Sequence, residues 1–118
     1  MKALVIGAGG VGRAIANIAV RRPFITSMVI ADRTLSRAEE AVYRVKDPRF
    51  SAAQVNAAEL EDLRELIRRV DPDVVINAVD PRFVMPIFLA AKSKILITSI
   101  WQCLSQGRIL TTRIAKLV

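Results

Sequence analysis

A cluster of glycines near the start of the chain has the spacing of a turn that binds phosphate groups. Residues 7–12 (GAGGVG) follow an apolar run at 2–6, typical of a buried strand, and lead into a stretch with apolar side chains at helical spacing. In such a unit Gly7 permits the tight turn, Gly9 lets the backbone approach a diphosphate, and Gly12 lets helix and strand pack closely. Unpaired amides and the dipole at the helix start favour negative charge there. The predicted diphosphate contacts are Gly7, Ala8, Gly9, Gly10, Val11 and Gly12.

One acidic residue, Asp32, stands 20 residues beyond Gly12, directly after a second apolar run at 27–31. A carboxylate at this place can accept hydrogen bonds from the hydroxyls of an adenosine ribose. Asp32 would repel a 2′-phosphate, which favours NAD, whereas Arg33 could pair with that phosphate and keeps NADP open. The glycine turn and the acid together predict a dinucleotide site, with NAD as the expected cofactor.

Structural explanations of the same residues stay open at this point. Glycines in a strand-to-helix turn can serve backbone geometry alone, Asp32 can cap the turn that follows it, and Arg33 can be a solvated surface side chain. Asn77 and Asp80 follow a later strand, where such sheets present groups to a cofactor. Asp80 with Pro81 is equally an ordinary helix start, so both alternatives are kept for that segment.

Strand-like and helix-like segments alternate along the chain. The strands are apolar throughout rather than alternately apolar and polar, which indicates burial on both faces. We therefore expect an α/β fold, a Rossmann-type doubly wound parallel sheet in a single domain. Asn56 is expected to cap the third helix, and Pro86 to lie in the first turn of the fourth or to kink it. The expected strands lie at 2–6, 27–31, 53–55, 74–76 and 94–99, and the expected helices at 11–20, 58–70 and 81–91, with a further helix that is capped by Thr34 or Ser36 and runs to residue 45.

Composition excludes several classes of function. The 118 residues contain no histidine and one cysteine, Cys103, so no Cys/His metal cluster, internal disulfide or histidine catalyst is expected. The net charge of +7 is uneven, because residues 1–91 carry +2 and residues 92–118 carry +5. A nearly neutral body does not favour nucleic-acid binding. The apolar runs are too short or too interrupted to span a bilayer and no signal sequence is evident, so a cytoplasmic protein without membrane contact is expected.

The chain resembles the N-terminal nucleotide-binding domain of the saccharopine dehydrogenase family in three segments, MKALVIGAGGVGRAIA, VIADRT and VINAVDPRF. That family includes saccharopine reductases, lysine dehydrogenases and carboxynorspermidine dehydrogenases, which are NAD(P)-dependent oxidoreductases acting on C–N bonds of amino-acid-derived substrates. Asn56 departs from the aspartate usual at its place in the family. The implied contacts beyond the glycine turn are Asp32 and Arg33 for the adenosine ribose, Asn56 and Ala57 for the adenine edge, and Ala78 and Val79 for the nicotinamide half.

The substrate domain of that family has no counterpart in this sequence. The resemblance covers residues 1 to about 91, whereas family members continue with a second domain that supplies specificity and catalytic groups. We therefore expect a truncated member with no catalytic residue, which binds cofactor without catalysis. The alternative is a non-enzymatic regulatory module that senses NAD or ATP through the same glycine turn and a similarly placed acid. A degenerate product that binds nothing is the third hypothesis.

The C-terminal tail does not match the family. Residues 1–100 are expected to form the dinucleotide-binding domain, and residues 101–118 an atypical tail. The basic excess of the tail and its lack of acids would follow from a shift of reading frame between about residues 91 and 97. Residues 102–118 would then be poorly ordered or loosely helical, and an exposed Trp101 would favour self-association into a homo-oligomer.

The frame-shift hypothesis makes a prediction about the gene. With allowed codons, reading two nucleotides along lets Ile97–Leu104 encode YIDMAMS and Ile109–Val118 encode PYDPYRETG, which resemble the family's continuation. We expect the nucleotides of the gene, read in that second phase, to spell these segments. Sequencing the gene checks this, and an unrelated peptide in that phase would end the hypothesis.

Overall fold

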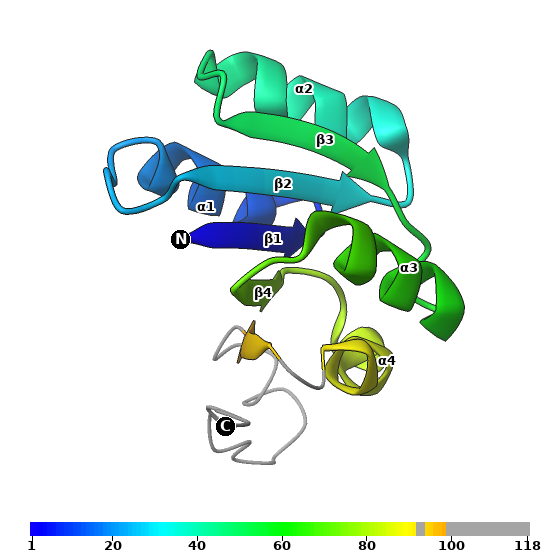
Figure 1. Ribbon diagram of the computed structural model, residues 1–118. Helices are drawn as coiled ribbons and strands as arrows, with labels where there is room; N and C mark the ends of the chain where they lie inside the picture. The colour runs from blue at the N-terminus through cyan, green and yellow to red at the C-terminus, as the bar shows by residue number, and fades with distance from the viewer. Residues whose placement is uncertain (92–93, 99–118) are drawn as a thin grey trace.

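The chain folds around one parallel sheet of five strands (Figure 1). The computed structural model describes residues 1–91 and 94–98. The strand order is β3-β2-β1-β4-β5, and each neighbouring pair is parallel. The strands are β1 (Lys2–Ile6), β2 (Ser27–Asp32), β3 (Phe50–Gln54), β4 (Val74–Asn77) and β5 (Ile95–Thr98). The helices are α1 (Gly10–Ala19), α2 (Leu35–Val45), α3 (Leu60–Val70) and α4 (Val84–Ala90), with a 3-10 turn η1 (Pro81–Phe83) before α4.

Helices cover both faces of the sheet, which confirms the predicted doubly wound α/β fold (Figure 1). Leu4 and Val5 of the central strand β1 are fully buried in opposite cores, as a continuous apolar run predicts. On one face of the sheet α1 and α2 pack through small side chains, and on the other α3 and α4 pack through larger aliphatic ones. These side chains are Ala16, Ala19, Ala38 and Ala41 on the first face, and Leu63, Leu66, Ile67 and Ile87 on the second. No helix in the described part of the chain is long and apolar enough to cross a membrane.

The strand order places a functional edge at the carboxyl ends of the strands. The chain runs outward from β1 to β2 and β3, then returns to β4 on the other side of β1. In the register Ile6 lies between Ala31 and Asn77, so the turn after β1 emerges between the ends of β2 and β4. A doubly wound sheet binds ligands at such a reversal of strand order.

The boundaries of some elements differ from the sequence prediction. The third strand, expected at 53–55, is Phe50–Gln54, and the third helix begins at Leu60 rather than at residue 58. Asn56 does not cap that helix, because the N-cap is Glu59. The Oδ1 of Asn56 instead accepts a hydrogen bond from the amide of Ala58, at 3.1 Å, and so forms a separate turn before the helix.

The structure tests the prediction for Pro86 but not the one for the C-terminal tail. Pro86 is the third residue of α4 and lies in its first turn, as predicted. The proposed tail at 101–118, with Trp101 and Cys103, lies outside the described residues, so the domain boundary near residue 100 stays a prediction.

An ion pair at the start of β3 ties the chain together at the opposite edge of the sheet. The guanidinium of Arg49 donates to both carboxylate oxygens of Asp47, at 2.9 and 3.0 Å. The same group donates to the carbonyls of Val20, Arg22 and Ile25 in the connection from α1 to β2. Hydrogen bonds from the Arg49 side chain and backbone lower the pKa of Asp47, so the carboxylate stays ionised and holds Arg49 in place.

Replacing Asp47 by asparagine is expected to lower thermal stability at neutral pH, because the charged hydrogen bonds with Arg49 are lost. Since the folded-state pKa of Asp47 is lowered, its stabilisation is fully present above about pH 4 and is lost as pH falls through that pKa. The difference in melting temperature between the wild type and D47N should therefore narrow below about pH 4. Thermal melts at stepped pH measure this, with E65Q as the control for removing an exposed carboxylate. A difference that does not change with pH would contradict the ion pair.

Candidate dinucleotide-binding site

The turn after β1 requires glycine at two positions. Gly7 has a φ of +115°, and a Cβ there would lie 2.6 Å from the carbonyl oxygen of Ala78. A Cβ on Gly12 would overlap the carbonyl oxygen of Gly7, so the first turn of α1 lies against the turn itself. The tight turn and the close helix packing expected at these two positions are therefore present in the structure.

The outer side of the same turn is open. A Cβ on Gly10 would meet no other atom within 4 Å, and one on Gly9 would have only the Arg37 side chain nearby, at 3.6 Å. Gly9 is the N-cap of α1 and offers no side chain to the first amides of the helix. Those amides have no intrahelical acceptor. Open space beside uncapped amides at the positive end of a helix dipole fits a diphosphate.

Asp32, the last residue of β2, holds the glycine turn against the loop before α2. Its Oδ1 accepts a hydrogen bond from the amide of Ala8, at 2.9 Å, and its Oδ2 accepts one from the amide of Thr34, at 3.0 Å. The cap on the following turn, left open from the sequence, is therefore real. A carboxylate has about four acceptor positions, so two of them stay open to hydroxyl groups.

A cavity of about 320 Å³ opens beside Asp32 at the carboxyl edge of the sheet. It brings together half of the residues predicted from the sequence, which lie at or just after the carboxyl ends of four strands, β1 to β4. Those six are Gly7, Asp32, Arg33, Asn56, Ala57 and Val79. The cavity is completed by Ile6, Val55, Ala58, Arg82 and Phe83, which the sequence reasoning did not single out.

The other six predicted residues lie next to this cavity rather than in its lining. Ala8 is buried and contributes its amide to Asp32. Ala78 presents its carbonyl to Gly7 and donates its amide to the carbonyl of Ile6. Gly9, Gly10, Val11 and Gly12 form the turn and the start of α1. The side chain of Val11 is half exposed.

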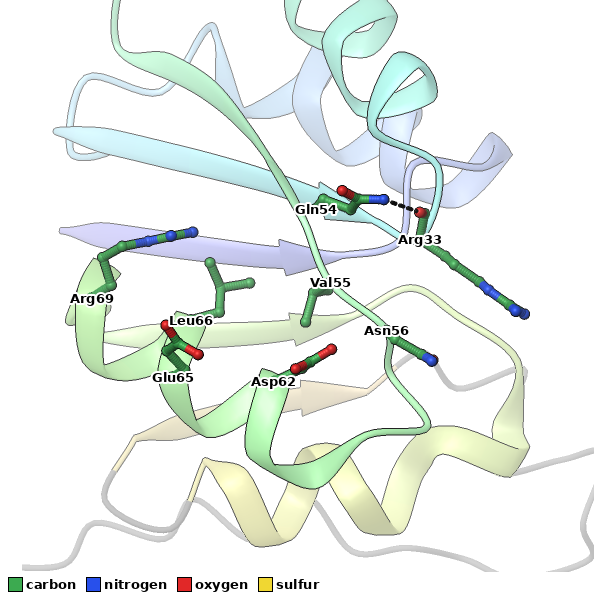
Figure 2. A pocket seen from close by; sticks show the side chains of 8 residues that line it. All are labelled: Arg33, Gln54, Val55, Asn56, Asp62, Glu65, Leu66 and Arg69. Carbon is green, nitrogen blue, oxygen red and sulfur yellow. Dashed lines mark hydrogen bonds between the residues drawn. The ribbon is translucent and has the colours of Figure 1, made fainter.

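A second, more polar cavity of about 430 Å³ adjoins the first between β3 and α3 (Figure 2). The two share Arg33, Val55 and Asn56. The side chain of Gln54 donates to the Arg33 carbonyl at 3.1 Å, which fixes the backbone at this boundary. In Figure 2 the Arg33 and Asn56 side chains point to the same side, away from Arg69. The remaining lining residues are Asp62, Glu65, Leu66 and Arg69.

The contacts of Asn77 and Asp80, at and after the end of β4, decide between the cofactor role and the structural role that the sequence left open for them. The side chain of Asn77 is 1% exposed, and its Oδ1 accepts a hydrogen bond from the amide of Val79. Asp80 accepts from the backbone amide of Arg82 at 2.9 Å and from its side chain at 3.1 Å, and these bonds, the backbone one foremost, lower the pKa of Asp80. Both residues organise the local backbone, and the residues of this segment that line the cavity are Val79, Arg82 and Phe83.

Comparison with known proteins places this arrangement in a family. The model of the saccharopine dehydrogenase NADP binding domain matches residues 3–96. The chain belongs to the saccharopine dehydrogenase family. This confirms the resemblance carried by the glycine turn, the VIADRT segment and the VINAVDPRF segment.

Relatives within the saccharopine dehydrogenase family are much longer than this chain. A carboxynorspermidine synthase of Vibrio cholerae is 37% identical over 90 residues, which cover 69% of this chain and 22% of the relative. One of Vibrio alginolyticus is 37% identical over 112 residues, covering 85% of this chain and 27% of the relative. The chain thus spans about a quarter of the length of these relatives.

Solved structures support the same fold. The saccharopine dehydrogenase (L-Glu forming) of Saccharomyces cerevisiae superposes with a TM-score of 0.71 at 20% identity, over 82% of this chain and 21% of that one. At this identity the likeness shows the shared architecture, and the family assignment rests on the sequence match.

Replacing Gly12 by alanine is expected to lower the unfolding free energy by about 1–3 kcal/mol, because the new Cβ would overlap the Gly7 carbonyl. Gly10→Ala adds the same methyl group to the same helical turn, where it meets open space. That variant is expected to be as stable as the wild type or slightly more stable, since alanine favours the helix. Urea unfolding of both variants measures the difference, and equal stabilities would contradict the close contact between Gly12 and Gly7.

Proposed function

We propose that this chain binds a nicotinamide dinucleotide, with the diphosphate over the glycine turn and the adenosine ribose on Asp32. The observation that carries the proposal is the contact between these two parts. The Ala8 amide donates to Asp32 at 2.9 Å, so the open helix start and the carboxylate have a fixed relative position. The glycine turn supplies amides to phosphate oxygens, and Asp32 retains acceptor positions for ribose hydroxyls.

The remaining contacts follow from the order of the loops around the cavity. Arg33 and Asn56 lie where the two cavities join, on the β3 side of Asp32, and are proposed to hold the adenine end together with Ala57. Ala78 and Val79 follow β4, on the other side of Gly7, and are proposed to contact the nicotinamide half. Asp32 favours NAD, and the adjacent Arg33 keeps NADP within reach.

The reaction class is proposed from the family and from the bound group. A nicotinamide dinucleotide supplies or accepts a hydride. We propose that the parent enzyme is an oxidoreductase acting on the C–N bond of an amino-acid-derived secondary amine or imine. The names carboxynorspermidine synthase and carboxyaminopropylagmatine dehydrogenase, carried by two relatives, are consistent with such substrates. The part of the chemistry assigned to this chain is to bind and orient the dinucleotide, and none of its residues is assigned a catalytic role.

Calorimetric titration of the folded chain with NAD, NADP and ATP tests the proposal. We expect saturable binding of NAD and a preference for NAD over ATP. Asp32→Ala should lower the ratio of NAD to NADP affinity by about tenfold, because a charged hydrogen bond to the ribose is lost and the repulsion of a 2′-phosphate is relieved. Damage to the turn would affect both dinucleotides alike and leave this ratio unchanged.

Two outcomes would contradict the proposal. A preference for ATP would favour the regulatory nucleotide-sensing module. Failure of a folded sample to bind any dinucleotide would favour a degenerate protein that has kept the fold without the function.

A further inference from the structure

Arg37, in the first turn of α2, lies beside the glycine turn and has no part in the site described so far. A Cβ built on Gly9 would lie 3.6 Å from the Nη2 of Arg37. Because Gly9 has no side chain, nothing of its own stands between this guanidinium and the open side of the turn. The placement matters only if phosphate groups bind there, so the inference rests on the proposed function.

Hydrogen bonds through Asp32 fix the backbone of Arg37 relative to the turn. Asp32 accepts from the Ala8 amide with one carboxylate oxygen and from the Thr34 amide with the other. The carbonyl of Thr34 in turn accepts from the amide of Arg37, at 3.0 Å. The chain of contacts runs from the glycine turn through Asp32 and Thr34 to Arg37, and the Arg37 side chain returns to the turn at Gly9.

The charge of Arg37 is not neutralised by its surroundings. Glu40, one turn further along α2, is paired with Arg13 at 3.4 Å and with Arg44 at 2.7 Å. Within residues 1–91 and 94–98, no carboxylate forms an ion pair with Arg37. The carboxylate of Asp32 has turned both oxygens toward backbone amides. An exposed guanidinium beside uncapped helix amides creates a positive field at the turn.

We propose that Arg37 is a phosphate-binding residue of the dinucleotide site and donates to phosphate oxygens beside Gly9. A guanidinium presents paired donors that match the geometry of a phosphate group and keeps its charge at all physiological pH values. Arg37 lies five residues after Asp32, in the first turn of α2 and beside the glycine turn, whereas Arg33 lines the two cavities. The phosphate can be part of the diphosphate or the 2′-phosphate of NADP, and both present the same chemistry to the arginine.

Calorimetric titrations of R37Q, R37K and R44Q with NAD and NADP test this role. Arg44 is the matched control, because R44Q removes the same charge from the same helix at a position two turns further along, where Arg44 pairs with Glu40 at 2.7 Å. We expect R37Q to weaken dinucleotide binding by about tenfold and to reduce the salt dependence of the dissociation constant. R37K should recover part of the affinity, and R44Q should bind like the wild type.

The two dinucleotides distinguish the source of the phosphate. An equal loss for NAD and NADP in R37Q assigns Arg37 to the diphosphate, and a loss confined to NADP assigns it to the 2′-phosphate. If the wild type binds dinucleotide and R37Q binds both with unchanged affinity and salt dependence, the role of Arg37 is overturned while the proposed function stands. If the folded wild type binds neither dinucleotide, both fail together.

Discussion

The carboxylate of Asp32 joins the two segments on which the candidate site depends. The glycine turn after β1 and the loop after β2 belong to separate strands, and parallel strand pairing alone does not fix their loops. Asp32 accepts a hydrogen bond from one backbone amide of each loop. These two bonds join the glycine turn, the end of β2 and the start of α2 into a single unit. Hydrogen bonds to a charged acceptor are roughly twice as strong as neutral ones, so this link is well suited to hold loop geometry.

The same link connects the structural and the functional interpretations of these residues. From the sequence, capping a turn and binding a ribose were alternative explanations of Asp32. In the structure the cap occupies two acceptor positions of a group that has about four. A ligand hydroxyl can therefore be added without breaking the loop. Removing the carboxylate would also disturb the turn, which affects both dinucleotides alike, so the ratio of NAD to NADP affinity reports on ligand recognition more cleanly than either affinity alone.

Much of the fold follows from local patterns in the sequence. Continuous apolar runs predicted the buried parallel strands, and the tight turn at Gly7 and the close packing at Gly12 followed from the position of the glycines between a strand and a helix. The prediction that Asn56 caps the third helix was wrong, because its side chain accepts a hydrogen bond in a local turn that competes with capping. Arg37 and Arg82 were missed because long side chains reach their sites through the fold, and sequence spacing does not record the direction in which they point. The outcome for residues 101–118 stays a prediction, since they lie outside the described residues.

A crystal structure of this chain in complex with NAD would show whether Asp32 and the glycine turn bind the dinucleotide together. We expect the diphosphate to lie over the amides that open α1. We also expect a ribose hydroxyl within hydrogen-bonding distance of Asp32, while the Ala8 amide keeps its bond to the same carboxylate. A ribose out of reach of Asp32, or a diphosphate bound away from the glycine turn, would contradict this expectation.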